Sequence, residues 1–170
     1  MDIQLDDHEL VQKLNQLLGR LLDTRKLTAG LAASLLHATE ENFAAEGRPG
    51  WAGLSPAYAA TRKKGKIMQL SGTLARSITP FSTINTAGLS TTVPYAAIHQ
   101  WGGTTRPHVI KPKNGKALYF NGHFAKMVNH PGSKIPSRPY LPITAAGDIQ
   151  PEALPEIWDT VNHWWGSGFR

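Results

Sequence analysis

The stretch "YAAIHQWGG", Tyr95–Gly103, decides how this chain is laid out. Tyr95 and Ile98 are three residues apart, the spacing at which side chains on one face of a helix meet, so the segment predicts a short helix packed on a sheet. The two glycines that follow, Gly102 and Gly103, allow a positive-φ turn that other side chains resist. We therefore expect the chain to leave its folded body here and begin an extension.

His99 and Gln100 stand just before those glycines and give the segment the look of a catalytic site. At the exit of a short helix, both side chains can instead hydrogen-bond backbone carbonyls or a neighbouring subunit. We predict that His99 serves folding or assembly rather than turnover.

Four helices are predicted around this segment. Leucines at spacings of three and four indicate an amphipathic helix over Asp7–Leu22, which a short loop joins to an antiparallel second helix over Thr28–Ala45. A third helix is expected over Ser55–Arg62, with Ser55 as the cap and a proline at the first position, and a fourth over Pro151–Trp165. In the second helix the side chains expected to face inward are Leu31, Leu35, Leu36 and Phe43.

The rest of the chain has the short alternating runs and turn signals of β structure. Ile78–Ile84 and Leu89–Val93 read as two strands joined by "NTAG", and "LSGTLARSI" before them as a turn with Leu74 inward. Three β-rich runs follow Gly103, "HVIKP", "KALYF" and "FAKMVNH", separated by "KNG" and "NG" turn signals. "HPGSKIPSRPYLP" is proline-punctuated, so we expect an extended loop that closes on the core. The predicted fold is α+β: an N-terminal helical hairpin, a small antiparallel sheet with a long β-hairpin arm, and a C-terminal helix.

Charge is segregated along the chain. Residues 1–46 carry eight acids and four bases, residues 47–147 carry thirteen bases and no acid, and residues 148–170 carry four acids and one base. Such a pattern favours an electrostatic partner, either nucleic acid or an acidic protein face. It is equally compatible with acidic helices that neutralise the basic middle within one fold or between subunits.

No arrangement of residues typical of catalysis is present. The seven histidines form no HExxH pattern, there is no cysteine for a disulfide, a thiolate or a zinc site, and the basic middle has no carboxylate to complete a metal site. Phosphate-binding glycine loops and a GxSxG nucleophile elbow are also missing. We predict a protein that is not an enzyme and needs no metal or cofactor. No apolar run is long enough to span a membrane, and we expect no membrane partner.

Nonspecific nucleic-acid binding is the alternative function. "RKKGK", Arg62–Lys66, places four positive charges in five residues, and Trp51, Tyr58 and Tyr119 could offer stacking faces. No zinc finger or other sequence-reading motif accompanies them, so the expected contact is with a phosphate backbone.

Four elements in a fixed order carry a family resemblance. They are "EGRPGWAGL" (Glu46–Leu54), "LSGTLARSI" (Leu70–Ile78), "YAAIHQWGG" (Tyr95–Gly103) and "RPYL" (Arg138–Leu141). Together they resemble the phage virion morphogenesis family of Mu-like G proteins, which is related to tail-completion and head–tail neck proteins of tailed phages. The segment His108–Lys134 is long for that family and is similar instead to the hairpin arm of head–tail joining proteins.

The resemblance implies a structural subunit, made in the host cytoplasm and incorporated in the virion at the tail or neck. It implies one tail-completion or neck domain over residues 1–170: a helical hairpin (1–46), a core (47–103 and 138–147), an arm or loop (104–137) and a C-terminal helix (148–170). The implied partners are further copies in a sixfold ring, other neck, connector or tail-tube proteins, and genomic DNA in nonspecific contact.

Two sets of candidate site residues follow. The residues expected at subunit or partner interfaces are Trp51, Tyr95, His99, Gln100, Trp101, Gly102, Gly103, Tyr119, Phe120, Arg138 and Pro139. Those expected to face DNA in the ring lumen or an acidic partner are Arg62, Lys63, Lys64, Lys66, Lys111, Lys113 and Lys116.

Overall fold

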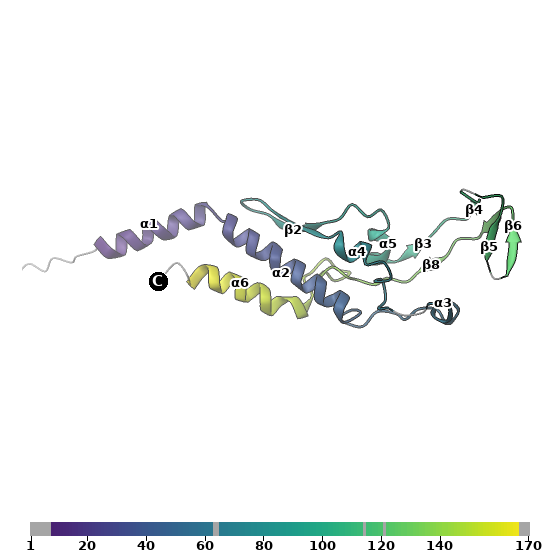
Figure 1. The fold of residues 1–170 in the computed structure, drawn as a ribbon. Helices are drawn as coiled ribbons and strands as arrows, with labels where there is room; N and C mark the ends of the chain where they lie inside the picture. The colour runs from purple at the N-terminus through teal and green to yellow at the C-terminus, as the bar shows by residue number, and fades with distance from the viewer. Residues whose placement is uncertain (1–7, 63–64, 114, 121, 167–170) are drawn as a thin grey trace, which may run out of the picture.

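A computed structural model describes residues 8–62, 65–113, 115–120 and 122–166 of the chain. The molecule is elongated, with a helix projecting from one end, a β ribbon from the other, and a mixed α+β body between them (Figure 1). The predicted fold class is confirmed.

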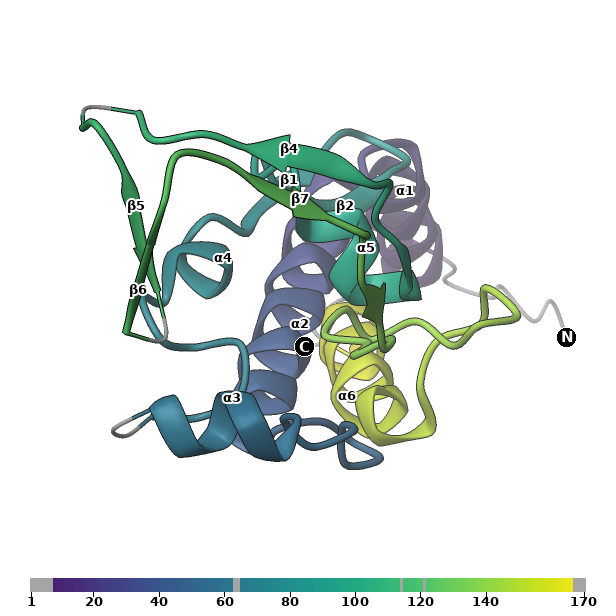
Figure 2. The same ribbon diagram turned by 90° about the vertical axis from the view of Figure 1, so that its right-hand side faces the viewer.

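The body is built around α2 (Arg25–Ala44), a helix of 20 residues. Two elements pack on it: α6 (Leu154–Gly166), which follows the 3₁₀ turn η1 (Pro151–Ala153), and the hairpin of β1 (Thr79–Ser82) and β2 (Ala87–Ser90) (Figures 1 and 2). This hairpin is antiparallel, as predicted, and shorter than expected.

The α2–α6 contact is close because small side chains form it. A Cβ atom on Gly30 would lie 2.8 Å from the methyl carbon of Thr160, and Ser34 Oγ lies 2.8 Å from the hydroxyl of Thr160. Larger side chains at either position would push the helices apart, so the sequence at this contact sets the spacing of the two helices.

The buried face of α2 differs from the predicted one. Phe43 is buried as predicted, whereas Leu31, Leu35 and Leu36 are all half-buried, and of these three only Leu36 packs on the apolar cluster described below. The buried positions are mostly small or polar, because both neighbours of α2 approach its backbone closely: Thr28, Ala32, Ser34, Ala38, Thr39, Asn42 and Phe43.

A compact apolar cluster lies where the C-terminal end of α2 meets the segments that follow it. Leu74 enters the cluster from α4 (Thr73–Arg76), as predicted, and Ala96 from α5 (Ala96–Trp101). Its full membership is Phe43, Trp51, Leu74, Ile78, Ala96 and Tyr140. The short helix α3 (Pro56–Thr61) follows Trp51 in the chain, and the Ser55 hydroxyl caps it as expected.

The first helix, α1 (His8–Leu22), ends at the predicted residue, and Asp23 and Thr24 join it to α2. Its apolar stripe does not pack on α2: Leu10, Leu14 and Leu18 are 61%, 51% and 55% exposed. The packing expected between the first two helices is formed instead between α2 and α6, and α1 projects beyond the body (Figure 1).

Three antiparallel ladders form the ribbon at the other end. From its root outward, β3 (Gly103–Thr104) pairs with β8 (Lys134–Ile135), β4 (His108–Ile110) with β7 (Val128–His130), and β5 (Leu118–Phe120) with β6 (His123–Ala125). Residues 104–137 are called the arm below.

The inner two ladders of the arm share one register, since three residues separate them on each strand. Beyond them the register shifts: seven residues lie between β4 and β5, but only two between β6 and β7. The unequal spacers make an elbow at which the tip, β5–β6, turns away from the inner ribbon (Figure 2). Among the described residues, no helix is long and apolar enough to span a membrane.

Candidate functional site

The arm is rooted on α5 through the Gln100 side chain. Its Oε1 accepts hydrogen bonds from the backbone N–H groups of Tyr140 and Leu141, each at 3.0 Å, and the N–H of Arg138 donates to the carbonyl of His99 at 2.7 Å. These bonds join the chain where it leaves the body to the chain where it returns. The root of the arm is therefore fixed even though the arm extends into solvent.

Gly102 makes this junction possible. Its φ is 73°, and a Cβ atom there would lie 2.8 Å from the backbone nitrogen of Ser137. Glycine is required both for the turn and for the close approach of the two strands, as the pattern at Gly102 and Gly103 predicted.

Arg138 connects the same junction to residues 51–53. Its guanidinium donates to the carbonyls of Ala52 and Gly53, each at 2.9 Å, and Trp51 Nε1 donates to the carbonyl of Pro139 at 2.8 Å. Burial lowers the pKa of Arg138, which is 8% exposed and whose positive charge meets carbonyl dipoles. Two motifs far apart in sequence are thus joined by hydrogen bonds.

A cavity of about 220 Å³ lies beside His99. Its walls include Tyr58, Arg62, Tyr95 and Arg138, and two atoms facing this region, His99 Nδ1 and Arg62 Nε, are buried without a hydrogen-bond partner. Burial lowers the pKa of His99, and the positive charge of Arg138 lowers it further. These donors and charges suit a carboxylate, and residues 47–147 contain no Asp or Glu to supply one.

The predicted interface residues divide by exposure. Trp51, Gln100 and Arg138 are buried, and the contacts that the structure gives them are within the chain. Pro139, His99 and Gly102 are half-buried, whereas Gly103 is exposed. The exposed aromatic members are Tyr95, Trp101 and Tyr119, at 43%, 55% and 66%. Phe120 pairs with His123 through its backbone in β5–β6, and its side chain lies outside the described residues.

The predicted basic residues divide between two places. Arg62 is half-buried, and Lys66 Nζ donates to the carbonyl of Ala44 at 2.5 Å, at the C-terminal end of α2. Lys111, Lys113 and Lys116 are exposed in the longer spacer of the arm's elbow. Lys63 and Lys64 lie outside the described residues.

The tip of the arm exposes aromatic surface. The rings of Tyr119 and Phe124 lie side by side across β5–β6 with centroids 4.8 Å apart, and Phe124 is 77% exposed. Tyr119 also lines an apolar hollow of about 310 Å³, together with Ile110, Leu118 and Val128.

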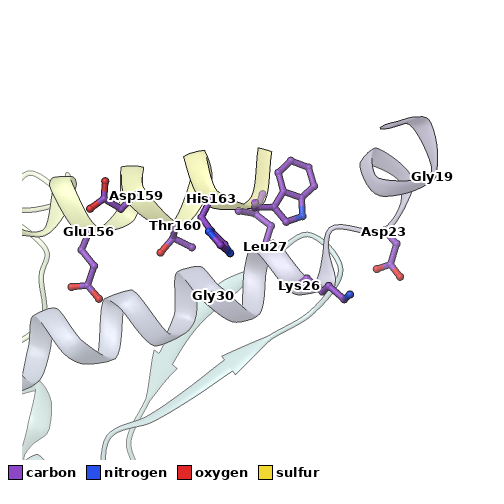
Figure 3. A pocket seen from close by; sticks show the side chains of 10 residues that line it. Gly19, Asp23, Lys26, Leu27, Gly30, Glu156, Asp159, Thr160 and His163 are labelled. Carbon is purple, nitrogen blue, oxygen red and sulfur yellow. The ribbon is translucent and has the colours of Figure 1, made fainter. Parts of the chain in front are cut away.

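A groove that the sequence did not reveal lies at the opposite end, between α2 and α6 and next to the end of α1. Its volume is about 720 Å³, and side chains of α6 point into it above α2 (Figure 3). Glu156 and Asp159 on α6 and Asp23 before α2 give it a negative rim, while Leu27 and Trp164 supply apolar surface. Hydrogen bonds from Arg25 hold the pKa of Asp23 at about 2, so its carboxylate stays ionised. We call this feature the acidic groove.

These geometries offer recognition surfaces at both ends of the molecule. Over the part of the chain that the structure describes, no three His, Asp or Glu side chains come together as a metal site would require. The junction is held by backbone carbonyls and amides, and the exposed features are an aromatic, basic arm and an acidic groove.

Comparison with known proteins adds a family. Residues 5–164 match the sequence model of the phage virion morphogenesis family. The chain is 29% identical over 170 residues to the "Putative capsid assembly protein G" of Escherichia phage Mu, covering 95% of this chain and 91% of that protein. No solved structure matches.

Proposed function

This chain belongs to the phage virion morphogenesis family, and we propose that it is a structural subunit that assembles into a ring at the head–tail junction or tail end, where it completes or joins the tail. A role in building the phage particle follows from the family; the ring and its position are our proposal. The observation that carries it is the pair of extensions at opposite ends of the molecule, each with apolar side chains exposed.

The arm supports assembly because it is not stable by itself. A two-stranded ribbon is marginal in water, and both edges of each two-stranded ladder among the described residues present unpaired backbone groups. Addition to a sheet of a neighbouring copy would satisfy those groups.

The cavity at His99 supports the same proposal. A carboxylate from another subunit would neutralise the Arg62 and Arg138 charges and give a partner to the buried nitrogen atoms there. The acidic terminal helices of a neighbouring copy carry such groups. In this arrangement Tyr95, Trp101 and Tyr119 contact neighbours, while the buried motif residues hold the shape of the interface.

Contact with passing DNA is a further component of the proposal. Lys111, Lys113 and Lys116 are exposed on an acid-free arm, so an arm facing the lumen would attract a phosphate backbone without reading sequence. Removing three phosphate contacts would lower the log–log salt slope of DNA binding by about 3. Lys13→Ala on α1 is the matched control, and an unchanged slope in the triple Ala variant would remove these lysines from the DNA contact.

Mass measurement tests the ring. Analytical ultracentrifugation and native mass spectrometry of the purified chain, alone and with the neck and tail-tube proteins encoded beside it, should show a closed oligomer. Electron microscopy of particles lacking the protein should show filled heads with unjoined or unfinished tails. A chain that stays monomeric alone and with those proteins contradicts the proposal.

A further inference from the structure

We propose that the tip of the arm of one copy, β5–β6, docks in the acidic groove of the next copy. This inference rests on the proposed ring and specifies its contact: which surface of one subunit meets which surface of its neighbour.

The apolar parts of the two surfaces are complementary. Tyr119 and Phe124 form an exposed aromatic pair at the tip, which costs free energy in water and is typical of an interface anchor. The groove has a volume of about 720 Å³, within the range of about 300–1,000 Å³ in which proteins hold ligands, and Leu27 and Trp164 give it an apolar lining. Docking of the aromatic pair in the groove would bury the apolar surface of the two rings and the apolar lining of the groove.

The charges are complementary as well. Residues 104–137 contain six Lys or Arg and no Asp or Glu, and Lys116 stands just before β5. The groove's rim carries Asp23, Glu156 and Asp159 against Lys26. The tip itself carries no Lys or Arg, but Lys116 and Lys126 stand on either side of it. These two charges attract the tip to an acidic rim and disfavour its docking on a basic arm. Asp23 is paired with Arg25, so the negative charge that remains open to a partner lies mainly on Glu156 and Asp159, and it disfavours a phosphate backbone in the groove.

The placement of the two surfaces requires a second copy. The groove lies at the α1 end of the molecule and the tip at the other, so one chain cannot close the contact on itself (Figure 1). A contact between two different surfaces is heterologous, and its repetition produces a ring when the rotation closes.

The β1–β2 hairpin leads toward the groove. Its turn is bound to the start of α2: Thr28 Oγ1 donates to the carbonyl of Thr83 at 2.6 Å, and Thr24 Oγ1 donates to that of Ile84. Gly19 and Lys26, which line the groove, flank this start. A neighbour's arm lying along the free edge of the hairpin would therefore run toward the groove.

Cysteine crosslinking tests the contact directly, because the chain has no cysteine of its own. Phe124→Cys protein is mixed with Leu27→Cys protein, oxidised, and resolved on non-reducing gels. We expect a dimer from the mixture and a ladder ending at the ring size from the double variant. The control replaces Leu27→Cys by Ala57→Cys, on the exposed surface of α3, and should give at least tenfold less crosslink.

Charge reversal supplies an independent measurement. Lys116→Glu should raise the dissociation constant between subunits about tenfold, and adding Asp159→Lys should restore most of the loss. Both side chains are exposed, so neither change should affect folding, which circular dichroism would verify.

The outcomes separate this inference from the proposed ring. A stable oligomer that gives no Phe124–Leu27 crosslink and no charge-reversal rescue keeps the ring, assigns the groove to another partner and overturns the inference. A chain that is monomeric in every mixture overturns both. A crosslink with rescue supports both.

Discussion

The body of this protein and its arm contain the same kinds of residue in opposite circumstances. In the body, Phe43 packs edge-on against Trp51 with ring centroids 5.7 Å apart and lies 5.4 Å from the ring of Tyr140, and it is 4% exposed. In the arm, Phe124 lies beside Tyr119 and is 77% exposed. The comparison indicates that the body is stabilised by contacts within the chain, whereas the extensions leave apolar side chains exposed to solvent.

Polar groups show the same contrast. Asn42 is fully buried: its amide donates to the carbonyl of Tyr140 and to Gln150 Oε1, and its Oδ1 accepts from Arg48 Nε. Asn129 in β7 is exposed to water. The buried hydrogen bonds of Asn42 fix the relative positions of segments far apart in the sequence, whereas an exposed amide such as that of Asn129 places no such constraint on the fold.

The largest difference in stability should be the one between truncating Phe43 in the body and truncating Phe124 in the arm. Phe43→Ala should lower the free energy of unfolding by about 3–5 kcal/mol, because it leaves a cavity in the apolar cluster. Phe124→Ala should change it by no more than about 0.5 kcal/mol, because that ring is in solvent. Urea denaturation of both variants measures the difference; equal losses would show that the arm contributes to the stability of the isolated subunit.

The two asparagines should give the next largest difference. Asn42→Ala strands a buried carbonyl, a buried amide oxygen and an arginine, and we expect a loss of about 2–3 kcal/mol. Asn129→Ala should stay within about 0.5 kcal/mol. Thermal unfolding followed by circular dichroism checks the pair, and a tolerated Asn42→Ala would mean that water replaces the amide.

Acidification should have a smaller effect, through His99. Because burial lowers the pKa of His99 in the folded state, the unfolded chain binds this proton more readily, and stability falls as the pH drops below the ordinary value of about 6.5. Denaturation curves between pH 7.5 and 5.5 should show a shallower loss in His99→Asn than in the unmodified protein. Identical slopes in the two proteins would assign the acid sensitivity to other groups.

The smallest effect on stability should come from removing the arm. Thr104 lies directly opposite Lys134, so Asn-Gly can replace residues 105–133 and close a two-residue hairpin on β3–β8. The body should lose no more than about 0.5 kcal/mol, a shift in Tm of about 2 °C or less. Assembly should fail in the same variant. A body that unfolds without its arm would show that the body is not stabilised by its own contacts alone.

Local patterns were enough to predict the elements. Leucine spacing located α1 and α2, Ser55-Pro56 the start of α3, and the paired glycines the end of α5, because each signal acts within a turn or two of chain. In the arm, β4 and β5 each lie within a predicted run, because alternating residues between turn signals act locally. The single predicted run "FAKMVNH" is instead divided between β6 and β7, and β8 forms where an extended loop was expected.

Packing between distant segments was not predictable in the same way. The leucines of α1 have the pattern of a buried face but lie exposed, because amphipathicity does not say whether the apolar face meets its own chain or another. The sequence left open whether Gln100 bonds the backbone or a neighbouring subunit, and in the fold its side chain is buried against the backbone N–H groups of Tyr140 and Leu141. A periodic sequence pattern does not predict a hydrogen bond between residues 40 apart. The acidic groove was not predicted for the same reason, since its lining residues come from segments far apart in the sequence.

The shared register of the inner arm has a consequence for its length. Because β3–β8 and β4–β7 follow one pairing, removing two residues from each strand at facing positions, such as His108–Val109 with Asn129–His130, keeps every remaining pair and the faces that they present. Each such step would shorten the reach by about 7 Å. The arm can therefore change its length in steps of two residues per strand without changing which side chains lie on which face. Subunits with the same body could in this way reach over different distances.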